Sequence, residues 1–291
     1  MDLGVTQPAV SRMLSRFEQH LDVRLFERFS NGITLTDEGR ILYREVAQAF
    51  HDIEVAINEI EARANNKETV SLSVSTAFTT HWLMPRIHEF QKNHPAIELQ
   101  FQLIPGHIRG PVTDVDLGMR FVSGADAEHE AALMLPEILI PVCSPEYKKN
   151  MLDRSGQADS PQHTFVDLTR GDTDWFEQLM PDESPADGKR NTLEFSDYGI
   201  VLQAALLGQG IAVGWLNIVC YWLRIGALVP AIDKAITTGR ICHLVWTRQR
   251  SLSRASAKAK RWMIDQTLED VAAVNEMYPE LELSRYVDMQ S

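Results

Sequence analysis

The sequence predicts an α/β fold for most of the chain, and three observations lead to that prediction. From Thr69 onward, short β-rich runs alternate with helical runs, which is typical of βαβ units and a mainly parallel sheet. The alternation occurs in two series, and 291 residues exceed what one compact core usually takes, so we expect two α/β lobes. The first series is VSLSVS, HWLMPRIHEFQKNH, IELQFQLI and VDLGMRF, and the second is EILIPVCS, TFVDL, NTLEF, YGIVLQAALLGQ and GIAVGWL.

The composition is that of an ordinary globular protein, with 44% hydrophobic and 23% charged residues. No apolar run approaches the length of a membrane span, and the N-terminus has no secretory signal pattern, so we expect a cytoplasmic protein without membrane contact. Residues 1–50 hold six Arg and seven acidic residues, a net charge of −1, whereas the whole chain carries −12. Charge alone argues against nucleic acid, so a DNA-binding site has to be recognised from its motif.

The three cysteines are far apart in the chain and odd in number. Cys143 lies in IPVCS, Cys242 lies in GRICHLVW, and Cys220 is also in an apolar segment. We therefore expect buried free thiols in a reducing compartment rather than disulfides or a metal site.

The segment QPAVSRMLSRFEQHL has the stripe of an amphipathic helix. Val10, Leu14, Phe17 and Leu21 recur at spacings of four, three and four residues. Thr6 is placed to cap this helix, and Pro8 fits a first turn that needs no amide donor. The opposite face carries side chains that can donate to base edges or phosphates, namely Gln7, Ser11, Arg12, Ser15 and Arg16.

Two β-rich runs, VRLFERF and GITLT, follow this helix and are separated by Ser30, Asn31 and Gly32. They predict a hairpin, and a helix followed by such a hairpin is the order of a winged helix-turn-helix. Arg24 and Arg28 would flank the wing and contact phosphates. An amphipathic helix with a few arginines also occurs in proteins that bind no DNA, so periodicity alone leaves both interpretations open.

A long helix is predicted from Asp37 to about Asn65, because this stretch has no Pro and its only Gly is Gly39. Thr36 is placed to cap it. A heptad stripe runs along it for nearly three repeats, which favours a dimerising coiled coil, with packing on its own domain as the alternative. The stripe residues are Leu42, Val46, Ala49, Ile53, Ala56 and Ile60.

The N-terminal stretch LGVTQPAVSRMLSRFEQHLDVRLFERFSNGITLTDEGRILY resembles the head of LysR-type transcriptional regulators. TQPAVSR, LFER and LTDEG match the family's recognition segment, the start of its wing and the start of its linker helix, in order and at the expected spacing. The resemblance implies DNA binding by Thr6, Gln7, Pro8, Ala9, Ser11, Arg12, Arg16, Arg24, Arg28 and Asn31. It also implies dimerisation through the long helix, which would present two heads to a two-fold DNA site.

The family would place a first helix, and most of a second, ahead of Leu3, so the winged helix-turn-helix is expected to be partial. Without those helices, Val10, Leu14 and Phe17 lose much of their cover. The expectation is an upstream start or a shortened fragment. The predicted domains are residues 1–36 for the head and 37–66 for the linker helix.

Residues 69–291 resemble the family's effector-binding domain, which is similar to type 2 periplasmic solute-binding proteins. The resemblance rests on TVSLSVSTAFTTHWLMPRIHEFQKNHPAIELQFQL and SDYGIVLQAALLGQGIAVGW. It implies two lobes joined by two crossing strands, with a small molecule between them. By that analogy one lobe comprises residues 69–140 and 240–291, and the other comprises residues 141–239.

A ligand between such lobes would meet strand ends and helix N-termini, where free amides attract anionic groups. Each candidate also has an ordinary structural role. The hydroxyls of Ser75, Thr76, Thr79 and Thr80 could equally cap helices, and Arg120 could equally form a salt bridge between the lobes. Trp82, Trp215 and Trp222 could pack in the core. If these tryptophans faced the cleft beside Asp197, a quaternary amine would suit them. The candidate effector-binding residues are Ser75, Thr76, Thr79, Thr80, His81, Arg120, Phe195, Ser196, Asp197, Gly214 and Trp215.

No motif points to an enzyme, a cofactor or a metal. GQGIAVG, residues 208–214, follows a helix and opens a strand, the reverse of a dinucleotide-binding loop, and HExxH, CxxC pairs, GxSxG and GxxxxGK[ST] are absent. The expected partners are double-stranded DNA, a small-molecule effector and further copies of the chain as a homodimer or homotetramer, with RNA polymerase as a further candidate. The sequence does not decide among three classes of effector: a small organic acid, an amino acid and a quaternary amine. The alternative function is a cytoplasmic small-molecule-binding protein that has lost DNA binding.

Overall fold

The computed structural model describes residues 7–29, 32–64, 67–104, 112, 115–122, 129–152, 163–169, 174–181, 190–248 and 251–287. The chain divides into two compact units, Met1–Asn65 and Asn66–Ser291. Thr6 and Asn31, two of the predicted DNA-binding residues, lie outside the described residues.

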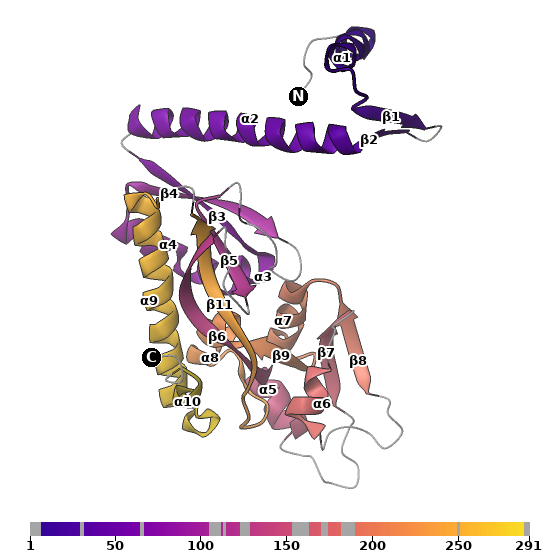
Figure 1. Ribbon diagram of the computed structural model, residues 1–291. Coiled ribbons are helices and arrows are strands. Elements are labelled where there is room, and N and C mark those ends of the chain that lie inside the picture. The colour runs from indigo at the N-terminus through magenta and orange to yellow at the C-terminus, as the bar shows by residue number, and fades with distance from the viewer. Residues whose placement is uncertain are drawn as a thin grey trace. The chain divides into compact units, whose positions relative to one another are not determined.

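The first unit contains a helix, a hairpin and a long helix in that order (Figure 1). Its elements are α1 (Gln7–Leu21), β1 (Phe26–Phe29), β2 (Gly32–Leu35) and α2 (Asp37–Ala64). The two strands are antiparallel, with Phe29 opposite Gly32. The predicted hairpin is therefore confirmed, as is the long helix from Asp37.

Among the described residues, the second unit contains a β-sheet of nine strands. The strand order is β4-β3-β5-β11-β6-β9-β7-β8, and β10 pairs with β6. The strands are β3 (Glu68–Ser75), β4 (Ile97–Ile104), β5 (Leu117–Val122), β6 (His129–Cys143), β7 (Thr164–Leu168), β8 (Asn191–Phe195), β9 (Ile211–Trp215), β10 (Val229–Pro230) and β11 (Ile236–Thr247).

The sheet is mixed, which corrects the prediction of a mainly parallel sheet. β3 runs parallel to β4 and β5, and β7 runs parallel to β8 and β9. At the centre, the long strands β6 and β11 pair antiparallel with each other and with β9 and β5 respectively. Two parallel groups are thus joined through two long antiparallel strands (Figure 1).

Helices pack against this sheet. α9 contacts β3 and β6, and α8 contacts α9 (Figure 1). The helical elements are α3 (Thr76–Phe78), η1 (Thr79–Leu83), η2 (Met84–Arg86), α4 (Ile87–Asn93), α5 (Pro145–Tyr147), η3 (Lys148–Leu152), α6 (Trp175–Leu179), α7 (Tyr198–Leu206), α8 (Leu216–Arg224), α9 (Arg254–Met277), η5 (Pro279–Leu281) and α10 (Ser284–Val287).

The helical run predicted for HWLMPRIHEFQKNH is confirmed, but it is not one regular α-helix. The segment forms a π-helical turn (η1), a 3₁₀ turn (η2) and then α4. Pro85 lies in the 3₁₀ turn, and a proline interrupts a regular helix because it lacks the amide donor and its ring crowds the preceding turn. The interruption places His81 and Trp82 in the π-helical turn.

The main core lies between the sheet and its helices and includes Phe78, Trp82 and Phe90, each fully buried. A second cluster, with Tyr147, Phe165 and Phe176, packs under β7 and β9. The three cysteines are free and buried, as the sequence predicts. Within the described ranges, no helix is both long and apolar enough to cross a membrane.

Candidate DNA-binding surface and effector site

Helix α1 presents the predicted polar face to the surface. Gln7, Pro8, Arg12 and Arg16 are exposed, and Ser11 is half-buried, as is Ala9. Nε of Arg12 donates to the carbonyl oxygen of Pro8 (3.3 Å), which holds the base of the guanidinium along the helix. The exposed arginines can reach phosphates or the guanine edge without desolvating a buried charge.

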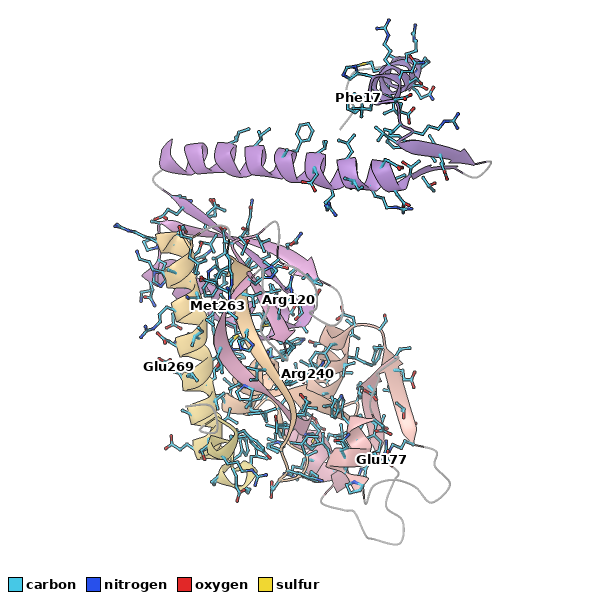
Figure 2. The ribbon with its side chains drawn as sticks, viewed as in Figure 1. Phe17, Arg120, Glu177, Arg240, Met263 and Glu269 are labelled. Atoms are coloured by element: carbon cyan, nitrogen blue, oxygen red, sulfur yellow. The ribbon has the colours of Figure 1, made fainter. Side chains whose placement is uncertain are left out.

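The apolar face of α1 has no cover within the described part of the first unit. Val10, Phe17 and Leu21 are 45%, 43% and 42% exposed (Phe17 is labelled in Figure 2), and none of the residues of α1 is buried. Leu14 of the same stripe is half-buried.

One carboxylate joins α1 to the wing, and sequence analysis did not single it out. Oε1 of Glu18 accepts hydrogen bonds from the backbone amides of Leu25 (2.8 Å) and Phe26 (3.2 Å). Leu25 is 3% exposed, the one buried hydrophobic residue among the described side chains of the first unit. Glu18 thus fixes the start of β1, and with it Arg24, which is exposed just before the strand. Arg28 lies on β1, and its side chain is outside the described set.

The wing returns to the long helix through Thr36. Its hydroxyl donates to the carbonyl oxygen of Arg24 (2.7 Å) and accepts from the amide of Gly39 (2.9 Å), so Thr36 caps α2 as predicted. The backbone of Gly39 lies against the carbonyl group of Leu25, a contact that cannot be predicted from the sequence. A Cβ at this position would lie 2.0 Å from the carbonyl oxygen of Leu25, so only glycine fits.

Helix α2 carries an exposed apolar stripe that shares Val46 and Ile53 with the predicted one and is shifted by one residue along the chain at its other positions. The predicted Val46 and Ile53 are 42% and 55% exposed, Ala49 is exposed and Leu42 is half-buried, while the side chains of Ala56 and Ile60 lie outside the described set. The other exposed apolar side chains of α2 near Val46 and Ile53 are Tyr43, Phe50 and Ile57. The exposed stripe consists of Tyr43, Val46, Phe50, Ile53 and Ile57, which again recur every three and four residues, the spacing of a coiled-coil seam.

The end of β3 and the segment that follows it contain five predicted effector-binding residues. Oγ of Ser75 accepts from the amide of Phe78 (3.1 Å), and the hydroxyl of Thr79 donates to the carbonyl oxygen of Ser75 (3.0 Å). These two residues therefore have the capping and turn-forming roles that the sequence left as the alternative. Thr76 is half-buried, and Thr80 is exposed.

His81 connects this segment to the start of α7. Its Nε2 donates to the carbonyl oxygen of Gly199 (3.1 Å), and Asp197 caps the same helix by accepting from the amide of Gly199 (2.7 Å). Burial lowers the pKa of His81 below its usual value, and the Gly199 carbonyl and the Asp197 charge oppose that effect. We call residues 75–83 and 195–199 together the junction site.

Phe195 and Ser196 lie in the junction site but contribute differently. Phe195 ends β8 and packs half-buried against the main core, whereas Ser196 is exposed. The structure thus brings the predicted residues after β3 and those before α7 together, from positions more than one hundred residues apart in the chain.

Arg120 lies on β5, buried and labelled in Figure 2. It donates to the backbone oxygens of Met119 (2.8 Å) and Ser73 (3.4 Å) and to Oγ of Ser73 (3.2 Å). Burial lowers the pKa of its guanidinium from the usual value. The Arg120 side chain therefore links β5 to β3. Its partner Ser73 lies two residues before Ser75 on β3.

The predicted Gly214 and Trp215 end β9, where Trp215 joins a second buried network. Its indole Nε1 donates to Oε1 of Glu137 (2.7 Å), a β6 carboxylate that is 2% exposed. The hydroxyl of Thr238 also donates to Glu137. Glu137 is not among the residues predicted from the sequence, although a lone charge inside the apolar run LPEILIPVC was a signal for it.

Among the described residues, no group of three or more His, Cys, Asp or Glu side chains could hold a metal ion. The polar groups of the second unit instead form internal networks around the sheet. These networks consist of hydrogen bonds and ion pairs between the chain's own residues.

Comparison with protein families decides the identity of the chain. Residues 63–268 match the LysR substrate binding domain, and residues 1–40 match the bacterial regulatory helix-turn-helix protein of the lysR family. The chain belongs to the LysR family. This LysR-type transcriptional regulator therefore combines a DNA-binding head with an effector-binding domain, and the family comprises DNA-binding regulators rather than enzymes, as the sequence predicts.

Curated relatives extend over nearly the whole regulator. The HTH-type transcriptional activator AmpR of Rhodobacter capsulatus is 27% identical over 271 residues, covering 92% of this chain and 91% of that protein. The glycine cleavage system transcriptional activator of Escherichia coli K12 is 25% identical over 264 residues, covering 90% and 86%. Both names describe transcriptional activators.

Solved structures support the fold of the second unit. The AmpR effector binding domain from Citrobacter freundii has a TM-score of 0.53 at 20% identity, covering 70% of this chain and all of that one. The effector domain of AmpR of Pseudomonas aeruginosa has a TM-score of 0.51 at 23% identity, covering 72% of this chain and all of that one. The predicted α/β effector domain of the LysR type is thus confirmed.

Proposed function

We propose that this LysR-type regulator binds a two-fold DNA site as a homodimer, or as a dimer of dimers, and responds to a small molecule bound at the junction site. The observation that carries the DNA-binding part is the exposed polar face of α1, with Arg12 and Arg16 next to a wing that Glu18 fixes in place. Gln7 and Ser11 of the same face are suited to base edges, and Arg24 and Arg28 to the flanking phosphates.

The dimer is proposed to form through α2. Its exposed stripe contains Phe50 and Ile53, which are 69% and 55% exposed. Apolar side chains at heptad spacing on an otherwise polar helix favour a second helix as their cover. Two heads would then address two half-sites of one duplex.

The effector is proposed to bind where the segment after β3 meets the start of α7. His81 is 1% exposed, yet it lies beside exposed or half-buried polar groups such as Thr80 and Asp197. Arg120 and Trp215 hold the neighbouring strand ends. With residues 1–36 as head, 37–66 as linker and 69–291 as sensor, we propose lobes of residues 69–140 with 240–291, and 141–239.

The effector acts only through a difference in its affinity for two arrangements of the regulator. If one arrangement binds DNA better, DNA must change effector affinity by the same factor. A small organic acid, an amino acid and a quaternary amine remain the candidate effector classes, and RNA polymerase remains a candidate partner for activation.

The test is fluorescence anisotropy of the full chain on labelled DNA from upstream of its own gene, against random DNA of the same length, at several salt concentrations. We expect preference for the upstream DNA and weaker binding at higher salt. Arg12→Ala should weaken binding to both DNAs and, if Arg12 contacts a phosphate, reduce the salt slope by about one. The matched control is Arg261→Ala, which removes an exposed arginine from α9 in the second unit. Equal affinity for both DNAs at every salt concentration would contradict the proposed site-specific binding, and no binding to either DNA would favour a sensor without DNA binding.

A further inference from the structure

Two buried polar atoms, one in the junction site and one on α8, have no hydrogen-bond partner within the described part of the chain. They are Nδ1 of His81 on η1 and Nε1 of Trp222 on α8. The two rings face each other edge to face, with centroids 6.0 Å apart and planes at 68°. Buried polar atoms are nearly always hydrogen-bonded in folded proteins, so these two atoms call for a polar partner that the described residues do not supply.

The hydrogen-bonding roles of the two atoms follow from their neighbours. A carbonyl oxygen can only accept, so the contact of His81 Nε2 with Gly199 places the ring proton on Nε2. Nδ1 of the neutral ring is then an acceptor. The indole Nε1 of Trp222 is a donor only. A single group that bridges the two atoms would therefore have to donate to His81 and accept from Trp222.

Three simple polar groups can be compared with this requirement. A carboxylate only accepts, so it would satisfy Trp222 and oppose the lone pair of His81. An ammonium group only donates, so it would satisfy His81 and oppose the N–H of Trp222. A hydroxyl group does both through one oxygen atom.

We propose that His81 and Trp222 form a subsite for a neutral hydroxyl group of the effector. This inference rests on the proposed effector function of the junction site. Because the other nitrogen of His81 holds Gly199 at the start of α7, a hydroxyl at Nδ1 lies one imidazole ring away from the contact that joins η1 to α7. Occupancy of the subsite thereby orients the ring that makes this contact. The rest of the effector can carry other groups.

The test uses three two-carbon probes that differ only in their polar group: ethanol, acetate and ethylammonium. Each is titrated into the full chain with ¹⁵N-labelled tryptophan, and the indole N–H signals of Trp222 and Trp262 are followed by NMR. Trp222→Phe assigns the first signal. Trp262, which packs against Trp82 and Phe90 instead, is the internal control. We expect saturable movement of the Trp222 signal with ethanol alone and no movement of the Trp262 signal.

His81→Gln provides the matched variant, because the glutamine amide can still donate to the Gly199 carbonyl but leaves no acceptor at the position of Nδ1. Ethanol binding should weaken about tenfold, the loss of one good hydrogen bond. A stronger response to acetate or ethylammonium, or unchanged ethanol binding in this variant, would overturn the inference. A long-lived water that shows an NOE to the Trp222 indole and that ethanol does not displace would overturn it too, since the group would then be a structural water.

The same samples are tested on DNA by anisotropy, which separates the two proposals. DNA preference without ethanol selectivity would leave the regulator function standing and remove the hydroxyl subsite. Ethanol selectivity without DNA preference would support the subsite and count against the proposed DNA-binding function alone.

Discussion

Arg240 on β11 forms a bidentate ion pair with Glu137 on β6, with its Nε 2.6 Å and its Nη2 2.7 Å from the two carboxylate oxygens. The carboxylate side chain is 1% exposed and the guanidinium 26% exposed; Arg240 is labelled in Figure 2. The pair lies where the register between β6 and β11 shifts, between Thr237 and Ile241, and Gly239 at that shift has a φ of +78°. The two central strands are therefore joined by charge where their regular ladder is interrupted.

Arg240→Met should destabilise the second unit by about 3 kcal/mol, because it keeps the apolar stem but leaves the buried Glu137 without its cation. Trp215 and Thr238 still donate hydrogen bonds to Glu137 in this variant. The loss of stability should therefore lie near the lower end of the range for a broken buried ion pair. Urea unfolding at a fixed protein concentration measures it. Arg261→Met is the control: its pair with Asp265 is exposed, and the change should cost less than about 1 kcal/mol. Equal effects of the two variants would show that the Glu137 pair contributes little.

Gly39→Ala should disrupt the first unit, because the added Cβ would lie 2.0 Å from the carbonyl oxygen of Leu25. That oxygen also accepts from the amide of Thr36 (3.0 Å), so the clash displaces the end of the wing. We expect a loss of about 2 kcal/mol or more in the stability of the head and weaker DNA binding, measured by limited proteolysis and anisotropy. Arg40→Ala, at the next and exposed position, should leave both nearly unchanged. Normal DNA affinity in Gly39→Ala would show that the head adapts to the side chain.

The sequence predicts well the features that depend on local periodicity. The stripe of α1, the hairpin and the start of α2 at Asp37 follow from spacing and turn residues within a few positions. Strand direction does not, because β6 and β11 pair across about a hundred residues and their antiparallel course depends on the whole topology. This is why the sheet is mixed where local alternation favours a parallel one.

In the candidate effector site, too, the locally determined features are predictable from the sequence and the long-range contacts are not. Ser75 and Asp197 are recognisable as residues that begin helices, and both do cap them. The contact of His81 with Gly199, and the indole nitrogen of Trp222 that has no partner among the described residues, depend on which elements meet in the fold, and no spacing rule encodes that. Glu137 is intermediate, since a charge in an apolar strand predicts a buried partner without naming it.

His81 should make stability depend on pH. Burial lowers its folded pKa below 6.5, so the unfolded chain binds the proton more readily, and stability falls as pH drops below that value. The stability difference between the wild type and His81→Gln should therefore shrink by up to about 1.4 kcal/mol per pH unit as pH falls from 7 towards 5. The nearby charge of Asp197 opposes this effect and moderates it.

Urea unfolding of both proteins at several pH values provides that measurement. His88→Gln, at an exposed position on α4, is the control and should follow the wild type. A stability difference for His81→Gln that stays constant from pH 7 to pH 5 would mean that His81 is protonated as easily in the folded as in the unfolded chain.

The stripe on α2 distinguishes a dimerising helix from one that packs on its own domain. Phe50→Ser combined with Ile53→Ser removes two exposed apolar side chains from the proposed seam. Because these side chains are already exposed in the single chain, the change should cost little folding stability within it, whereas a coiled coil would lose its central contacts. Sedimentation equilibrium should show a shift towards monomer, with DNA affinity at least about tenfold weaker because the two heads no longer bind together. Arg44→Ser, which truncates an exposed polar residue on the same helix, should remain a dimer. A double variant that keeps the oligomeric state and DNA affinity of the wild type would place the dimer interface elsewhere.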